Sequence, residues 1–197
     1  ESTPILVLPG GTPTSRIGQF PDFRAVESYQ TITKWSAQIN HADRIPEMMR
    51  RAYTSLRTGR RGPVMVQIPA DIAQAEIDES LMNYRPVMGI SSAGDPADIK
   101  AAVTALLKAK NPVIYAGQGI LWGESSAALQ QFAELTNVPV MTSNTGKSAF
   151  PENHPLSLGP IGMHGHAEAN KMMAEADCVL AIGTRFSDRS VGTFEAF

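Results

Sequence analysis

The stretch PVIYAGQGI (residues 112–120) sets the pattern that decides the fold, because an apolar run ends there in a glycine-rich turn. Such runs are typical of buried strands in a parallel sheet. Two later runs, VPVMTS (138–143) and DCVLAIG (177–183), repeat the pattern. Helical patterns at 125–136 and 167–176 each precede one of these two runs. Strands that alternate with helices at this spacing predict an open, mostly parallel α/β sheet.

A helix with strong start signals precedes the first of these strands. Asp95 is expected to cap it, Pro96 to take its first position, and Asp98 to favour the positive end of its dipole. Its apolar residues recur at helical spacing and are expected to face the core: Ile99, Ala102, Val103, Leu106 and Leu107.

The first half of the chain has a similar organisation. PILVL (4–8), AVESYQTIT (25–33) and PVMVQIP (63–69) are predicted to be strands. A helix capped by Asp43 and stopped by Gly59 is expected between the last two. This order of elements again predicts a buried sheet.

A change of character separates the two halves. Residues 73–95 lack a sustained period and contain Ser-Ser-Ala-Gly near their end, so they are predicted to be a linker. The predicted fold class is therefore α/β, with two doubly wound, mostly parallel-sheet units at residues 1–72 and 96–197.

Composition argues against several classes of partner and site. The net charge is −2 and no basic stripe occurs, so nucleic-acid binding is not expected. No apolar run approaches the roughly 20 residues that span a bilayer, so no membrane partner is expected. Cys178 is the single cysteine, is expected in a buried strand, and cannot form an internal disulfide. A cytoplasmic setting fits these features.

Small residues gather where the predicted strands of the second half end. Gly117, Gly119, Gly146 and Gly183 would allow backbone N–H groups to approach a phosphate or ribose, and Arg185 could pair with a phosphate. The carboxyl edge of an open α/β sheet is where ligands bind. Glycines can equally serve tight strand-to-helix turns, but three such turns in register favour a nucleotide-sized ligand.

The glycine pattern does not match a standard dinucleotide fingerprint. Gly117, Gly119 and Gly123 have a different spacing, and the acid that usually ends the next strand is replaced by Ser143 and Asn144. A standard NAD site is therefore disfavoured.

The segment GKSAFPENHPLSLGPIGMHGH (146–166) has neither a helical nor a strand period. His164 and His166 are too few for a metal site, so we expect none. His164 is instead interpreted as a loop residue close to a flat ligand. Met163 would supply a soft apolar contact beside it, although core packing explains a lone methionine nearly as well.

Several segments together resemble the thiamine-diphosphate enzymes of the acetolactate synthase type. The segments are NPVIYAGQGI, PVMTSNTGKSAFPENHPLSLGPIGMHG, AEAN and ADCVLAIGTRFSDR in the second half, and TITKW, DRIPEMMRRAY and RRGPVMVQIPADI in the first. The resemblance extends over nearly the whole chain, and its most specific part is the long motif that ends in Gly-Met-His-Gly.

The resemblance implies an identity for each half. Residues 1–72 would be the later part of the pyrimidine-binding domain, and 96–197 the first part of the central, FAD-binding domain. The residues that would bind the flavin are Gly117, Gln118, Gly119, Ser143, Asn144, Gly162, Met163, His164, Gly183 and Arg185. Flavin in this family is structural and is not required as a redox agent.

The resemblance also implies an activity. The complete enzyme would use thiamine diphosphate and Mg²⁺ to decarboxylate a 2-keto acid such as pyruvate and ligate the product, as in branched-chain amino acid biosynthesis. The activating glutamate and the metal-binding motif would lie outside this segment, so no catalytic residue or metal ligand is assigned and the segment alone is expected to be inactive. A homodimer or homotetramer is expected, and a regulatory subunit is an open option.

Four places depart from the family pattern. They are Phe20-Pro21-Asp22 for a usual Phe-Gln-Glu, Gln30 for an arginine, Asn40 for a lysine and Ser187 for an aspartate. Two alternatives therefore stay open: a thiamine-diphosphate decarboxylase without flavin, and a non-catalytic nucleotide-binding module. A sirtuin-like deacylase is excluded, because one cysteine cannot form its zinc ribbon.

Overall fold

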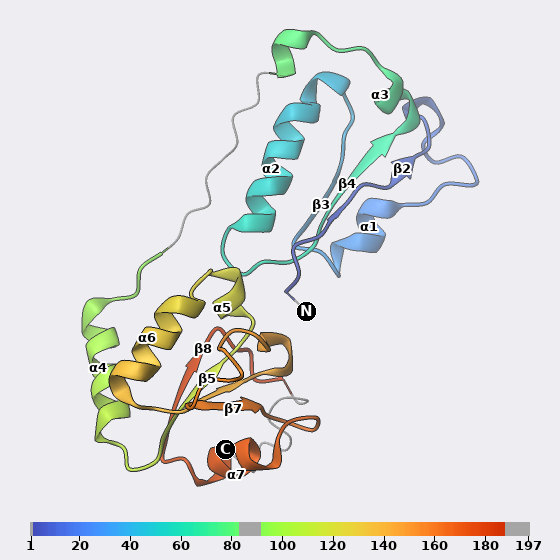
Figure 1. Cartoon of the computed structure of the whole chain (residues 1–197). Coiled ribbons are helices and arrows are strands. Elements are labelled where there is room, and N and C mark those ends of the chain that lie inside the picture. Colours follow the sequence, from blue (N-terminus) through green and yellow to red (C-terminus); the bar gives the residue numbers. More distant parts are fainter. Residues whose placement is uncertain (1, 83–91, 188–197) are drawn as a thin grey trace. The chain divides into compact units, whose positions relative to one another are not determined.

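The computed structural model describes residues 2–82 and 92–187 (Figure 1). The chain divides into two compact units, Glu1–Ala93 and Gly94–Phe197. This boundary falls inside the expected linker at 73–95, of which residues 83–91 lie outside the described part. The end of the expected second domain, 188–197, lies outside it as well.

A parallel four-stranded sheet forms the first unit. Its strands are β1 (Leu6–Val7), β2 (Gly10–Gly11), β3 (Trp35–Gln38) and β4 (Val64–Pro69). Each of the other three pairs in parallel with β4. The starts of β1 and β3 both align with Val64, whereas β2 aligns with Ile68 and Pro69. β4 is therefore the central strand, which explains why its apolar run is almost wholly buried.

Helices cover this first sheet. They are α1 (Ala25–Gln30), α2 (Ile45–Arg57) and α3 (Ala70–Gln74), with short 3₁₀ turns at Thr14–Arg16, Ala42–Arg44 and Glu79–Met82. One stripe of α2 is buried against β4, and the core cluster there consists of Met48, Ala52 and Leu56 of α2, Val64 and Val66 of β4, and Ile39, which follows β3. Their spacing on α2, four residues apart, is the helical period that the sequence shows.

The second unit contains another parallel four-stranded sheet, in the order β7-β6-β5-β8 (Figure 1). Its strands are β5 (Pro112–Ala116), β6 (Val140–Thr142), β7 (Ser157–Pro160) and β8 (Cys178–Ile182). β5 pairs with β6 on one side and with β8 on the other. The carboxyl ends of β5, β6 and β8 therefore meet at one edge, as the sequence predicts.

Apolar residues line both faces of the second sheet. The helices of this unit are α4 (Pro96–Lys108), α5 (Gly119–Trp122), α6 (Ser126–Thr136) and α7 (Ala167–Glu175). Ile114 packs in one cluster with residues of α4 and α6, whereas Tyr115 packs in another with residues of α7. This alternation confirms a doubly wound α/β fold.

Most of the predicted elements are present. The strands expected in 4–8, 63–69, 138–143 and 177–183 form, each somewhat shorter than its apolar run. Asp95 caps α4 as expected, since its Oδ1 accepts a hydrogen bond of 2.7 Å from the Ala97 N–H. Cys178 is a free thiol on β8, although it is only half-buried.

The strand predicted at 25–33 is wrong, because residues Ala25–Gln30 form helix α1. Ala25 is fully buried and Glu27 lies in the first turn, where a carboxylate favours the helix dipole. The β-branched residues that suggested a strand lie mostly after the helix. The actual strand is β3 (Trp35–Gln38), whose polar side chains hid it.

Two local predictions about helix and loop boundaries are also wrong. Asp43 does not cap α2: it lies in a 3₁₀ turn, and Arg44 occupies the cap position without a side-chain bond. The segment 146–166 is not wholly irregular, because it contains β7 (Ser157–Pro160). A strand of four residues with a glycine and a proline gives too little period to be found from sequence.

The apolar face predicted for α4 is only partly in the core. Leu106 is fully buried, whereas Ile99 is 53 % exposed and Leu107 is 58 % exposed. No helix in the described ranges is both long and apolar enough to cross a membrane.

Candidate functional site

The carboxyl edge of the second sheet brings together residues from three strand ends. The Gly117 N–H donates to the Ile182 carbonyl at 2.9 Å, and the Gly119 N–H donates to the Gly183 carbonyl at 2.9 Å. On the other side of β5, the Ser143 N–H donates to the Ala116 carbonyl at 2.9 Å. Gly117, Gly119, Gly183 and Ser143 are therefore neighbours, as their places after β5, β6 and β8 suggest.

The glycines of this edge pack backbone against backbone. A Cβ atom on Gly117 would lie 2.3 Å from the Gly183 carbonyl oxygen and 2.4 Å from the Thr184 Cα. A Cβ atom on Gly119 would lie 2.6 Å from the Gly183 Cα, and one on Gly146 would lie 2.7 Å from the Gly117 carbonyl carbon. These positions require glycine for packing, so the gathering of glycines does not by itself require a ligand.

The polar groups of this edge are largely used inside the protein. The Gly119 N–H is committed to Gly183, so it has no further proton for a phosphate. Ser143 is buried, and its Oγ accepts from the Gly146 N–H at 2.9 Å, which caps the 3₁₀ turn Asn144–Gly146. Asn144 is exposed, so its side chain is accessible to a ligand.

The loop Gly162–Gly165 projects its two central side chains into solvent. Met163 is 75 % exposed and His164 is also exposed, so core packing of Met163 is excluded. Gly162 has φ +103°, a backbone conformation that side chains rarely adopt, and the Gly165 N–H returns to the Gly162 carbonyl at 3.0 Å. The loop is thus a tight turn that presents a methionine and a histidine.

Asn170 on α7 holds this turn from behind, and residue-level reasoning missed it. Its Oδ1 accepts from the Gly162 N–H at 2.8 Å, and its Nδ2 donates to the Gly162 carbonyl at 3.1 Å. The one sequence signal was its place in the AEAN segment of the family resemblance.

Arg185 is exposed on the segment that follows β8. The next residue, Phe186, packs edge-on against the ring of Tyr115, with the two ring centroids 5.6 Å apart. Tyr115 is fully buried in the sheet, so this contact anchors the segment that carries Arg185. Phe186 has φ +50°, which a bulky residue adopts only when its surroundings hold it.

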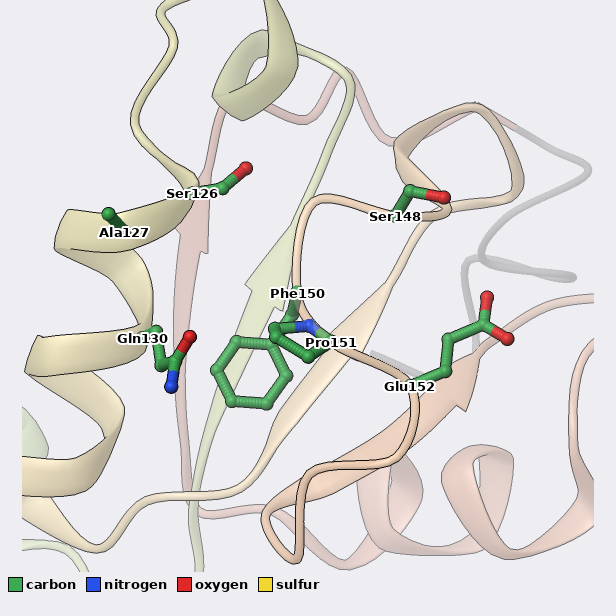
Figure 2. A pocket seen from close by; sticks show the side chains of 7 residues that line it. All are labelled: Ser126, Ala127, Gln130, Ser148, Phe150, Pro151 and Glu152. Carbon is green, nitrogen blue, oxygen red and sulfur yellow. The ribbon is translucent and has the colours of Figure 1, made fainter.

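The positions of the predicted site residues can be compared with the possible metal ligands and hollows of the described ranges. No group of three His, Cys, Asp or Glu side chains in residues 2–82 and 92–187 is placed to hold a metal ion. A hollow of about 370 Å³ lies in the second unit. Figure 2 shows the side chains that line it, which are Ser126, Ala127, Gln130, Ser148, Phe150, Pro151 and Glu152. None of the ten predicted site residues lines it.

The first unit has a hollow of about 470 Å³ at the end of its central strand. Its lining residues are Gly10, Gly11, Thr12, Phe20, Pro21, Asp22, Phe23 and Gln67. Asp22 is oriented there by the Gly18 N–H, which donates to its Oδ2 at 3.0 Å. The hollow thus contains the Phe-Pro-Asp triplet that departs from the family's usual sequence near the thiamine site.

Comparison with known proteins gives matches over the whole chain. The family model described as thiamine pyrophosphate enzyme, central domain, matches residues 99–197. A probable acetolactate synthase large subunit of Methanococcus aeolicus is 38 % identical, a glyoxylate carboligase of Escherichia coli O157:H7 is 35 % identical, and an acetolactate synthase large subunit of Corynebacterium glutamicum is 34 % identical. Each alignment includes 100 % of this chain and 34 %, 34 % and 32 % of the relative, respectively. The chain therefore spans about a third of the length of these relatives.

Proposed function

Because the chain belongs to the thiamine pyrophosphate enzymes, whose central domain residues 99–197 match, we propose that it is part of a 2-keto acid carboligase or decarboxylase of the acetolactate synthase type. The matches to proteins named acetolactate synthase and glyoxylate carboligase support this proposal. When bound, thiamine diphosphate supplies the electron sink for loss of carbon dioxide from the keto acid.

The two units have separate roles in this proposal. The first is the later part of the pyrimidine-binding domain, and its hollow at Asp22 and Gln67 would lie near the bound thiamine diphosphate. The second is the start of the central domain. We assign no catalytic residue and no metal ligand to this chain, since Mg²⁺ would be held outside it.

We place FAD at the carboxyl edge of the second sheet. The observation that carries this placement is the turn at Gly162–Gly165, which exposes an apolar side chain, Met163, beside His164. A flat aromatic ring would remove Met163 from water and contact its sulfur. Arg185 lies exposed on the segment after β8 and would pair with a phosphate.

The remaining predicted residues would contribute to an FAD site in different ways. Gly117, Gly119 and Gly183 pack against one another, so they would shape the floor of the site without donating to it. Gln118 is half-buried and Asn144 is exposed, so their side chains are the polar groups that reach outward. Ser143 acts through the turn that it caps.

A flavin-free enzyme of the same family is the second candidate. The packing of Gly117 against Gly183 favours it, because the fold alone accounts for these glycines. A non-catalytic nucleotide-binding module is a weaker alternative, since the relatives that match the whole chain are named as enzymes.

The proposed assembly is at least a homodimer, in which the thiamine site forms between two subunits. Several relatives are named large subunits, which supports a further regulatory subunit as partner. The substrate is a small 2-keto acid, and pyruvate is the first to test.

The test uses the complete protein that contains this chain. Purified protein should show the visible absorbance of bound flavin and should consume pyruvate only with thiamine diphosphate and Mg²⁺. Arg185→Ala should weaken flavin binding by on the order of 1.5–3 kcal/mol if the arginine pairs with a phosphate. Turnover without any bound flavin would favour the flavin-free alternative, and the absence of thiamine-dependent turnover of any 2-keto acid would refute the enzymatic proposal.

A further inference from the structure

Asn170 makes an unusual pair of contacts for a residue on an exposed helix face. Its backbone N–H bonds to the His166 carbonyl at 3.0 Å and so belongs to the first turn of α7. Its side-chain amide both accepts from and donates to the backbone of Gly162, at 2.8 and 3.1 Å. The amide thus satisfies one N–H and one C=O of the same residue, as a neighbouring strand would.

The turn that Asn170 holds is also closed by its own bond, in which the Gly165 N–H donates to the Gly162 carbonyl, and it is joined to the rest of the unit at its two ends. Before the turn, the Ile161 N–H donates to the Thr142 carbonyl at 3.0 Å, and after it the His166 N–H donates to the Pro160 carbonyl at 2.8 Å. Between these bonds, the side chains of Met163 and His164 point into solvent. The two bonds from Asn170 fix the base of this tip.

The buried contacts of α7 lie outside the tip. The helix packs on the sheet through Ala169 and Met173, which are buried in the cluster around Tyr115. An exposed loop gains little stability from being held in one conformation, whereas a binding loop gains affinity, because its ordering no longer opposes binding. The rigid presentation of an exposed methionine is therefore better explained by a ligand than by the fold.

We propose that Asn170 is a positioning residue, which holds the turn Gly162–Gly165 so that Met163 and His164 meet a planar cofactor ring. This inference rests on the proposed flavin site. Asn170 does not touch the ring itself and acts through the backbone of Gly162.

The experiment compares Asn170→Ala and Asn170→Asp with wild type in the complete protein, with flavin as the probe. Asn170→Ala removes both bonds and should raise the flavin dissociation constant about 5-fold or more. Amide hydrogen exchange at Gly165, measured without flavin, should accelerate. The matched control is Asn111→Ala, which removes another side-chain-to-backbone bond, from Nδ2 to the Glu175 carbonyl at 3.3 Å, at the opposite edge of the sheet. The control should alter neither quantity.

Asn170→Asp separates positioning from general stability. The carboxylate keeps the acceptor for the Gly162 N–H but turns a second acceptor toward the Gly162 carbonyl. Flavin affinity should be low at neutral pH and should recover as the pH falls and the carboxyl group gains a proton to donate. Urea unfolding of both variants should match that of Asn111→Ala.

The outcomes divide the hypotheses. If wild type binds flavin and Asn170→Ala binds it with the same affinity, the positioning role is refuted and the proposed flavin site is retained. A loss of stability in proportion to the loss of affinity assigns Asn170 a structural role and also overturns the inference. A wild-type protein that takes up no flavin overturns both the flavin placement and this inference, while thiamine-dependent turnover is judged by its own assay.

Discussion

At the carboxyl edge of the second sheet, backbone packs against backbone, whereas at the amino edge a carboxylate accepts hydrogen bonds from the neighbouring strand start. Gly117 and Gly183 lie too close for any side chain. At the opposite edge, Asp177 accepts from the N–H groups of Lys110 and Asn111, at 2.8 Å each, and so joins the starts of β5 and β8. The carboxyl edge is thus held by close backbone packing, and the amino edge by hydrogen bonds to a carboxylate.

The difference explains where a ligand can be held. The amino edge uses its charged group to close the sheet. At the carboxyl edge the strand ends pack through glycines, and exposed side chains such as Met163 lie beyond this packed backbone. Predictions follow from substitutions at each edge and beyond the packed one.

The largest effect is expected at the packed edge, from Gly117→Ala. The added Cβ would lie 2.3 Å from the Gly183 carbonyl oxygen, so the strand ends must separate. We expect the free energy of unfolding of the second unit to fall by at least about 3 kcal/mol, the upper end of ordinary overpacking. Urea unfolding followed by the fluorescence of Trp122, which lies in α5, measures this change.

Gly10→Ala is the control for this substitution, because no atom lies within 4 Å of the added Cβ and the backbone has no positive φ. If Gly117→Ala were as mild as Gly10→Ala, the close packing of the strand ends would be refuted.

The packed edge also shows what the sequence could predict. Apolar runs and the Asp95 cap are local signals, and they located the strands and the start of α4. The gathering of Gly117 and Gly183 at one edge followed from the parallel order of strands. The reason for these glycines did not follow, because it is a contact between segments more than 60 residues apart in the sequence.

The errors have similar physical origins. β3 was missed because Ser36 and Gln38 interrupt its apolar residues, although β4 pairs with it along its whole length. Asn170 was missed because its role depends on a two-point bond across a turn, which leaves no periodic trace. Met163 could be assigned to a loop, but its exposure required the structure.

A smaller and pH-dependent effect is expected at the amino edge, from Asp177→Asn. The N–H groups of Lys110 and then Asn111 lower the pKa of Asp177 below its ordinary value of 3.8. The folded state therefore gains stability from the ionised group above that value, and loses it as the pH falls through the lower folded pKa. Asp177→Asn should lower the free energy of unfolding at neutral pH. The further fall in this free energy below about pH 4 should be smaller in the variant than in wild type.

Urea midpoints of wild type and variant at neutral and acid pH measure this difference. Gly117→Ala serves as the comparison. It changes no titratable group, so its loss of stability should stay constant with pH. If the loss of stability in Asp177→Asn were also constant with pH, the charge of the Asp177 carboxylate would not stabilise the fold.

The smallest effect on folding is expected beyond the packed edge, at Met163. Its side chain is 75 % exposed, so Met163→Ala should change the free energy of unfolding by no more than about 0.5 kcal/mol. Flavin affinity should fall instead, since a methionine sulfur against an aromatic ring contributes about 0.3–1.5 kcal/mol. Leu135→Ala is the matched control, because Leu135 on α6 is 86 % exposed and its removal should alter neither quantity. Equal flavin affinity in the Met163 variant and wild type would mean that the tip is not the cofactor contact, and the exposed Asn144 and Arg185 would then be the residues to test.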